Sequence, residues 1–286
     1  EKALNNLSFE VKQGEVLGLL GPNGAGKTTF LSILGGTVLK TQGKVNVWGF
    51  DLDKNPRQVK ASIGIVPQEI NLDAFFSPKK LLDLQAGLYG VPKKNRITDI
   101  ILKMVSLEDQ ANSYSRNLSG GMKRRLLIAK AMVHQPPILV LDEPTAGVDV
   151  ELRKKLWENV KDLNKEGVTI ILTTHYLFEA QKMCDRIAII NKGNLVALDT
   201  TQQLLERIQT KKVRFKIKNL SKDETLILNG VRFEITGNSS ITATYEKNVH
   251  KFESILSFLK QKNLEILDIS TEDTDLEDVF VQLTNN

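Results

Sequence analysis

A glycine-rich segment at residues 21–28 constrains the fold of this chain more than any other feature of its sequence. The segment reads Gly-Pro-Asn-Gly-Ala-Gly-Lys-Thr, and it follows an apolar run at residues 16–20 that has the length of one strand. A helical pattern begins at its end and continues through residue 34. A strand, a tight glycine turn and a helix in direct succession are typical of a sheet whose parallel strands are joined by crossover helices.

The same alternation of short β-branched runs and helical patterns continues to residue 197. Further strands are predicted at residues 63–67, 138–141, 168–173 and 186–190, with more amphipathic strands at residues 7–11, 45–48 and 195–197. Residues 77–135 differ because they contain helical patterns only, beginning with the helix-start pair Ser77 and Pro78. The sequence therefore predicts an α/β sheet domain at residues 1–205 with a helical insertion at about residues 77–135.

The hydrophobic pattern changes after residue 205. Apolar and polar residues alternate strictly there, which indicates strands with one exposed face that are usually antiparallel. Strands are predicted at residues 213–217, 226–228, 231–235, 241–245 and 264–269, and helices at residues 201–208, 249–259 and 276–283. We therefore predict a second, small α+β domain at residues 206–286.

Composition and charge exclude some classes of function. No apolar run approaches the roughly 20 residues that a membrane-crossing helix requires, so a membrane role would need a partner. The net charge of +5 is spread along the 286 residues instead of forming a basic tract, which argues against a nucleic-acid partner. Cys184 is the single cysteine, so the chain has no internal disulfide, as is usual in a reducing compartment.

The glycine-rich segment matches the pattern of a phosphate loop. In such a loop, backbone N–H groups turn toward bound phosphates at the positive end of the following helix. Lys27 would reach the β- and γ-phosphates of a nucleotide, and the Thr28 hydroxyl would bind Mg²⁺. A simple glycine turn is the alternative, but the strand before the segment and the helix after it favour the phosphate loop.

A pair of carboxylates ends the predicted strand at residues 138–141. Asp142 follows the apolar run directly, which is the arrangement that holds a magnesium ion beside a phosphate loop. Glu143 comes next, and adjacent side chains on a strand point apart. We therefore predict that Glu143 faces a water molecule that attacks the γ-phosphate, with a helix N-cap region before Pro144 as the alternative.

A second glycine-rich motif opens the last helix of the predicted insertion. Ser119, Gly120 and Gly121 precede the helical pattern that ends near residue 135. Two glycines at a helix start can form an anion site separate from the first one. A glycine-rich helix cap is the alternative reading.

Together these motifs resemble those of the ATP-binding cassette (ABC) family, and they occur in the family's order across residues 1–205. The resemblance identifies Gln68 as the Q-loop glutamine, which touches the metal ion and the attacking water. It identifies the motif that begins at Ser119 as the signature, which contacts the γ-phosphate held by the opposite subunit. It also identifies Asp149 with the D-loop at the dimer interface, and His175 as the switch histidine near the γ-phosphate.

The predicted site takes ATP and Mg²⁺ as cofactors. The predicted catalytic residues are Glu143, His175, Lys27 and Gln68. The predicted metal ligands are Thr28, Gln68 and Asp142. The predicted nucleotide-binding residues are Gly21, Pro22, Asn23, Gly24, Ala25, Gly26, Lys27, Thr28, Thr29, Ser119, Gly120, Gly121 and Asp149.

The resemblance implies an ATP-hydrolysing transporter subunit. Two copies of the chain would close head to tail around two ATP molecules as a homodimer, bound to a separate integral membrane permease at the cytoplasmic face of the cell membrane. Three segments are similar to the ABC-2 drug-export branch, which includes the daunorubicin-resistance type; they are residues 118–127, 145–149 and 276–280. An importer subunit and a non-transport ABC ATPase are the alternatives.

Two features depart from the family pattern. Met122 ends the signature where glutamine is commoner, and the aromatic residue that stacks on adenine in the family is expected upstream of Glu1. The chain starts without a methionine inside a predicted strand, so we expect residues before it.

Two other segments suggest roles outside the nucleotide site. Phe75 and Phe76 end an apolar stretch that begins at Ile70. Adjacent residues of an extended loop point apart, so we predict that one ring is exposed and contacts a coupling helix of the permease. The alternative packs both rings beneath the helix that starts at Pro78.

Residues 206–286 contain no phosphate-binding or metal-ligand cluster, so we expect a regulatory or dimer-supporting role for them.

Overall fold

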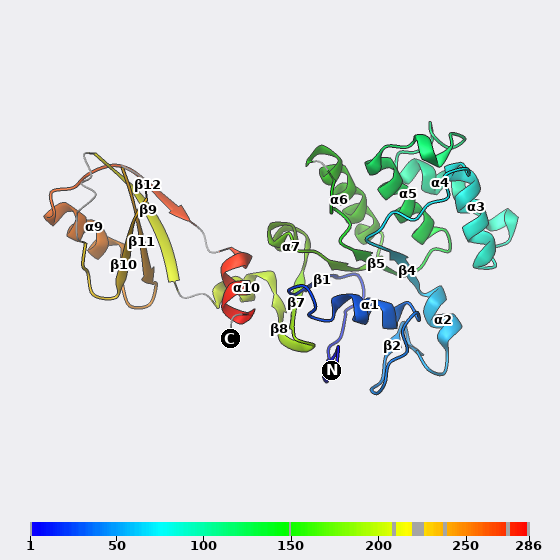
Figure 1. The fold of residues 1–286 in the computed structure, drawn as a ribbon, viewed down its shortest axis with the longest axis horizontal. Helices are drawn as coiled ribbons and strands as arrows, with labels where there is room; N and C mark the ends of the chain where they lie inside the picture. Colours follow the sequence, from blue (N-terminus) through cyan, green and yellow to red (C-terminus); the bar gives the residue numbers. More distant parts are fainter. Residues whose placement is uncertain are drawn as a thin grey trace. The chain divides into compact units, whose positions relative to one another are not determined.

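The computed structural model describes residues 2–148, 150–207, 210–218, 226–236, 239–272 and 275–284. The chain folds into two compact units, Glu1–Thr200 and Thr201–Asn286 (Figure 1). Our sequence-based boundary lies between residues 205 and 206, whereas contacts group residues 201–205 with the second unit. Within the described part of the chain, no helix has the length and apolarity that crossing a bilayer demands.

A six-stranded sheet with the order β4-β5-β6-β1-β7-β8 organises the first unit. Its strands are β4 (Ile63–Val66), β5 (Ile138–Asp142), β6 (Thr169–Thr173), β1 (Val16–Leu20), β7 (Arg186–Asn191) and β8 (Asn194–Thr200). Pairing is parallel from β4 through β7, and β8 pairs antiparallel with β7. Because helices cover both faces, every residue of β1 and β6 is buried, which explains why β1 and the centre of β6 are apolar.

Helices flank this sheet on both sides (Figure 1). The helices outside the insertion are α1 (Lys27–Leu34), α2 (Pro56–Ala61), α6 (Val150–Lys165) and α7 (Leu177–Met183). Leu31 and Leu34 of α1 and Val59 of α2 share a core cluster with β5 and β6. These contacts fix the N-terminus of α1 at the carboxyl end of β1, where the phosphate loop lies.

The helical insertion has the predicted helices. It contains α3 (Pro78–Leu88), η1 (Lys93–Asn95), α4 (Thr98–Met104), η2 (Ser115–Asn117) and α5 (Gly120–Met132). Ser77 caps α3 by accepting a hydrogen bond from Lys80 N, and Ser119 caps α5 by accepting one from Met122 N. Side-chain caps of this kind satisfy N–H groups that have no partner within the helix.

The second unit is a four-stranded antiparallel sheet with one helix packed on it. Its strand order is β10-β11-β9-β12. The strands are β9 (Thr210–Lys218), β10 (Val231–Thr236), β11 (Ser240–Glu246) and β12 (Glu265–Glu272). Helix α9 (Phe252–Gln261) covers one face, and α8 (Thr201–Glu206) contacts α10 (Leu276–Thr284). This α+β architecture and the α/β cassette confirm the predicted fold class.

Several predicted elements are wrong or shorter than expected. Residues 7–11 form no strand in the described chain; Leu7 and Phe9 alternate because they pack into the cluster around Leu19. The strand expected at residues 45–48 shortens to β2 (Asn46–Val47), which pairs with β3 (Phe50–Asp51).

Two further predictions fail in the second unit. The strand expected at residues 226–228 reduces to a single bridge between Leu228 and Val231, because the chain turns at once through Gly230, whose φ is 77°. The helix expected from residue 249 begins at Phe252.

Candidate nucleotide site

The phosphate loop connects the end of β1 to the start of α1. Gly26 has a φ of 107°, a left-handed value that favours glycine, and a Cβ there would lie 2.6 Å from the carbonyl oxygen of Ala3. A Cβ on Gly21 would lie 2.3 Å from the Ile190 carbonyl oxygen. Ala25 is buried, whereas Asn23, Gly24 and Thr28 are exposed and Thr29 is half-buried. The loop therefore packs closely against the domain and leaves its outer side open.

Lys27 is the first residue of α1 and folds over the loop. Its Nζ donates hydrogen bonds to the carbonyl oxygens of Gly21 at 2.6 Å and Pro22 at 3.0 Å. Burial lowers the pKa of Lys27, while the negative charges of Glu143 and Asp142 act in the opposite direction. A cation beside exposed helix N–H groups is the arrangement that binds phosphate.

Asp142 and Glu143 lie beside Thr173 of the neighbouring strand. The Thr173 hydroxyl donates to Asp142 Oδ1 at 2.5 Å. The Glu143 N–H points to the Thr173 carbonyl oxygen at 3.1 Å and to its Oγ1 at 3.0 Å. Glu143 has a φ of 45°, so the backbone turns abruptly after β5. Thr173 thus sets the position of both carboxylate residues, and the sequence patterns did not single it out.

The carboxylate of Glu143 lies between Gln68 and His175. Gln68 Nε2 donates to Glu143 Oε2 at 3.0 Å, and His175 Nδ1 lies 3.3 Å from the same oxygen. The Glu143 side chain is 16% exposed and that of His175 is 53% exposed. These residues follow β4, β5 and β6, which are neighbours in the sheet. The structure therefore brings together three of the four predicted catalytic residues at adjacent strand ends.

The signature residues stand apart from this cluster. Ser119 and Gly120 are exposed at the N-terminus of α5, and Gly121 is buried. Within the described residues, no hydrogen bond joins these three to the phosphate loop. Their exposed N-terminal position leaves them open to a ligand presented from outside the chain.

Asp149 lies outside the described residues, but the segment before it is held by a buried network. The Thr145 hydroxyl donates to Glu179 Oε2 at 2.7 Å, and Arg153 Nε lies 3.2 Å from Glu179 Oε1. The Arg153 guanidinium also lies 4.6 Å from the ring centroid of Tyr176, the residue next to His175. This network joins residues 145–148 to the loop that carries the histidine, and the sequence patterns missed it.

The donor groups suit a magnesium ion. Thr28 offers a hydroxyl, Asp142 a carboxylate and Gln68 an amide oxygen, which are the hard oxygen ligands that Mg²⁺ prefers. No group of three His, Cys, Asp or Glu side chains that could hold a metal occurs among residues for which placement is described.

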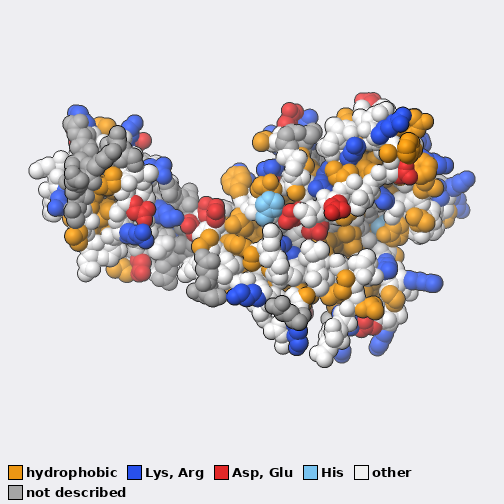
Figure 2. All heavy atoms as spheres, viewed as in Figure 1, with side chains coloured by type: hydrophobic (Ala, Val, Ile, Leu, Met, Phe, Trp, Pro, Cys, Tyr) orange, Lys and Arg blue, Asp and Glu red, His pale blue; other side chains and the backbone are white. Residues whose placement is uncertain are grey.

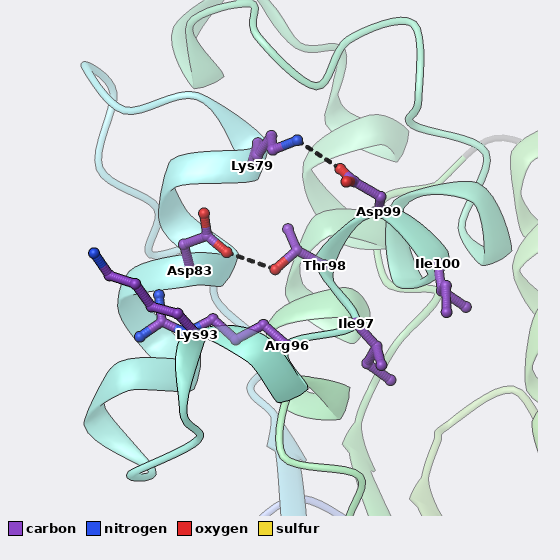
Figure 3. A pocket seen from close by; sticks show the side chains of 8 residues that line it. All are labelled: Lys79, Asp83, Lys93, Arg96, Ile97, Thr98, Asp99 and Ile100. Carbon is purple, nitrogen blue, oxygen red and sulfur yellow. Dashed lines mark hydrogen bonds and ion pairs between the residues drawn. The ribbon is translucent and has the colours of Figure 1, made fainter.

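A separate open pocket of about 530 Å³ lies in the helical insertion (Figure 3). It is lined by residues of α3, η1 and α4 and contains none of the predicted nucleotide-site residues. Within it Lys79 pairs with Asp99, and Thr98 donates to Asp83.

On the face shown in Figure 2, lysine and arginine side chains are scattered among acidic ones and form no single basic patch.

Comparisons with known proteins agree with this geometry. A profile of the ABC transporter family matches residues 4–146. The linearmycin resistance ATP-binding protein of Bacillus subtilis is 33% identical, over 98% of this chain and 93% of its own length. The Nod factor export ATP-binding protein I of Rhizobium johnstonii is 37% identical, over 98% of this chain and 89% of its own.

Solved structures show the same fold. A dimeric ATP-binding cassette in a post-hydrolysis state bound to ADP and Pi is 28% identical and superposes with a TM-score of 0.61, covering 70% of this chain and 90% of that one. An ATP-binding subunit of an ABC transporter is also 28% identical, with a TM-score of 0.65, covering 72% of this chain and 86% of the other.

Proposed function

The chain belongs to the ABC transporter family, and from that premise we propose that this ATPase is the motor subunit of an ABC-2 type exporter. The similarity to a resistance protein and to an export protein extends over 98% of the chain, so it includes the second unit as well as the cassette. That full-length similarity favours an exporter over an importer subunit or a non-transport ABC ATPase.

One observation supports the chemistry most directly. Gln68, Glu143 and His175 converge at the carboxyl ends of neighbouring parallel strands, beside the strand that leads into the phosphate loop. Ligands of open α/β sheets bind at such strand ends. ATP bound by the phosphate loop would therefore present its terminal phosphate to this cluster.

Each residue then has a defined role. The loop N–H groups and Lys27 bind the phosphates, and Thr28, Asp142 and Gln68 hold Mg²⁺, which stabilises the charge that develops on them. Glu143 accepts a proton from the attacking water. His175 stabilises charge on the γ-phosphate and holds the Glu143 carboxylate in place.

We infer that each active site requires a second copy of the cassette, because Ser119 and Gly120 of the signature are exposed and form no hydrogen bond with their own phosphate loop in the described chain. The proposed homodimer places the signature of one chain on the nucleotide of the other. The similar solved cassette in a post-hydrolysis state is dimeric, which supports this arrangement. ATP binding would drive closure and hydrolysis would reset it.

Complementation tests the head-to-tail site. Ser119→Arg should bind ATP without hydrolysing it, and Lys27→Ala should lose phosphate binding, so neither homodimer turns over. Mixed heterodimers contain one site in which both defects are absent and should recover part of the parental turnover. No recovery in verified heterodimers would contradict the composite site.

A membrane permease would dock beside Gln68, at the cytoplasmic face of the membrane. Phe75 is 69% exposed and Phe76 is 39% exposed. Both rings are therefore exposed where we predicted one, and the alternative in which both pack beneath α3 is wrong. We expect Phe75→Asp and Phe76→Asp to spare the ATPase of the isolated subunit and to reduce co-purification with the permease. Ile100→Asp, at an exposed apolar site on α4, is the matched control. Normal co-purification and transport for both phenylalanine variants would place the docking surface elsewhere.

Genetic context separates the transport directions. An adjacent gene for a six-span permease, without one for a substrate-binding protein, is the arrangement expected of an exporter; an adjacent binding-protein gene would favour import.

We also propose that the second unit supports or regulates the dimer. Truncation at Arg207 should change basal turnover or permease assembly, and unchanged values for both would refute that role.

A further inference from the structure

A buried arginine joins the two strand ends that carry the proposed catalytic side chains. Arg124 lies on α5 and is 2% exposed. Its Nη1 donates to the carbonyl oxygens of Pro67 at 2.9 Å and Gln68 at 2.8 Å, and its Nη2 donates to that of Glu143 at 3.3 Å. One guanidinium thus holds the backbone after β4 and the backbone after β5.

The contact to Glu143 matters because the backbone there is unusual. With a φ of 45°, Glu143 is in a left-handed conformation that residues with a Cβ rarely adopt. Thr173 holds its N–H from one side, and Arg124 holds its carbonyl from the other. The direction in which the carboxylate points depends on this local backbone turn.

Arginine suits this position better than any other side chain. Its planar guanidinium keeps several donors in fixed directions and stays charged. Burial lowers the pKa of Arg124, and the negative charges of Asp142 and Glu143 act to raise it. The carbonyl oxygens and the nearby carboxylates therefore compensate the burial of the charge.

We propose that Arg124 is a positioning residue for ATP hydrolysis: it fixes the backbones of Gln68 and Glu143 so that their side chains meet at the γ-phosphate. This inference rests on the proposed roles of Gln68 and Glu143. Among the described residues, Arg124 forms its hydrogen bonds with Pro67, Gln68 and Glu143 and none with the phosphate loop, so it sets the geometry of hydrolysis without binding the nucleotide.

The neighbouring residue provides a matched control. Arg125 is also on α5, and its Nη1 donates to the carbonyl oxygens of Val105 at 2.7 Å and Ser106 at 2.8 Å. Those carbonyls belong to the helical insertion and to none of the site residues. Arg125→Gln therefore removes a similar set of hydrogen bonds without touching the strand ends.

The experiment compares Arg124→Gln with Arg125→Gln in the full chain. For Arg124→Gln we expect kcat to fall about 100-fold, as a misplacement near 1 Å can cause, while affinity for a non-hydrolysable ATP analogue stays within about threefold, because the phosphate loop is unchanged. For Arg125→Gln we expect a lower Tm and nearly parental kcat. If both variants lose kcat in proportion to Tm, or if Arg124→Gln keeps kcat within about threefold of the parent, the proposal is wrong.

Two further variants cover the cases in which Arg124→Gln folds poorly or the site roles are wrong. Arg124→Lys keeps the positive charge and some hydrogen-bond donors, so its kcat should lie between that of Arg124→Gln and that of the parent. A parental kcat in Arg124→Lys would show that the fixed donor directions of the guanidinium are not needed, and it would overturn the proposal. In the Gln68→Ala background, Arg124→Gln should reduce kcat less than it does alone, because part of the effect of Arg124 acts through the Gln68 side chain, which is already absent. Parental turnover in Glu143→Gln would instead refute the proposed role of Glu143 and would be seen without any change at Arg124.

Discussion

The two units of this chain both contain helices and a sheet, but they differ in where polar side chains from separate loops can come together. In the first unit, parallel strands end at one edge of the sheet, so loops that are distant in sequence converge there. In the second unit, neighbouring strands run antiparallel, so consecutive loops alternate between opposite ends. Strand direction therefore decides which unit can assemble a site from separate polar loops.

The pattern of buried residues along the strands also differs between the two units. Every residue of β1 is buried, whereas β9 alternates, with Val213, Phe215 and Ile217 buried and Arg214 and Lys216 exposed. The parallel sheet is covered on both faces, while the antiparallel one has a charged open face. Thr173 and Thr145 of the first unit are buried at or just after strand ends, whereas Arg214 and Lys216 of β9 in the second unit are exposed.

The largest expected effect tests whether hydrolysis belongs to the first unit alone. Glu143→Gln should lower turnover about 10³-fold, because an amide cannot accept the proton of water. ATP should still bind and should shift the variant toward a dimer in sedimentation. The control is Glu234→Gln, which removes an exposed carboxylate paired with Arg232 in the second unit and should leave turnover unchanged. Turnover of Glu143→Gln within about tenfold of the parent would remove Glu143 from the mechanism.

The next effect concerns buried polar groups in the first unit. Thr145 is 1% exposed and donates to the buried carboxylate of Glu179. Thr145→Val should lower the free energy of unfolding by about 2 kcal/mol, because a hydrogen bond to a charged group is lost without a replacement. Thr244→Val, at a half-buried site of β11, should change it by less than about 0.5 kcal/mol. Equal effects in denaturant titrations would contradict the contrast between the units.

A smaller effect tests whether the units unfold independently. Ile241→Val in the core of the second unit should destabilise that unit by about 1 kcal/mol. Cys184 reports on the first unit, because it is buried and burial raises the pKa of its thiol, which protects it from thiol reagents. We expect unchanged labelling of Cys184 in Ile241→Val. Faster labelling would mean that the two units unfold together.

The smallest effect concerns the open face of the second unit. Lys218 Nζ lies 3.1 Å from Glu265 Oε2, and both side chains are more than half exposed. Glu265→Gln should change the free energy of unfolding by less than about 0.5 kcal/mol, because solvent screens exposed pairs. Thermal denaturation at low and high salt measures this. A loss comparable to that of Thr145→Val would show that the open face is more structured than its exposure indicates.

Much of the first unit follows from the sequence alone because its signals are contiguous. The phosphate loop, the apolar strand before Asp142 and the cap at Ser119 each depend on residues within a few positions of one another. Local backbone requirements, such as glycine at the left-handed turn of Gly26, act through the residue itself. Patterns of this kind can be recognised before the chain is folded.

The tertiary structure alone decided which distant groups meet. Arg124 lies 57 positions from Pro67 and 19 from Glu143, and nothing in its own helix distinguishes it from a solvated arginine. The alternation at residues 7–11 predicted a strand, yet Leu7 and Phe9 pack into a core without ladder partners. A strand requires a neighbouring chain to hydrogen-bond with, and a buried arginine requires acceptors around it. Both depend on where other segments pack, so periodicity and spacing cannot determine them.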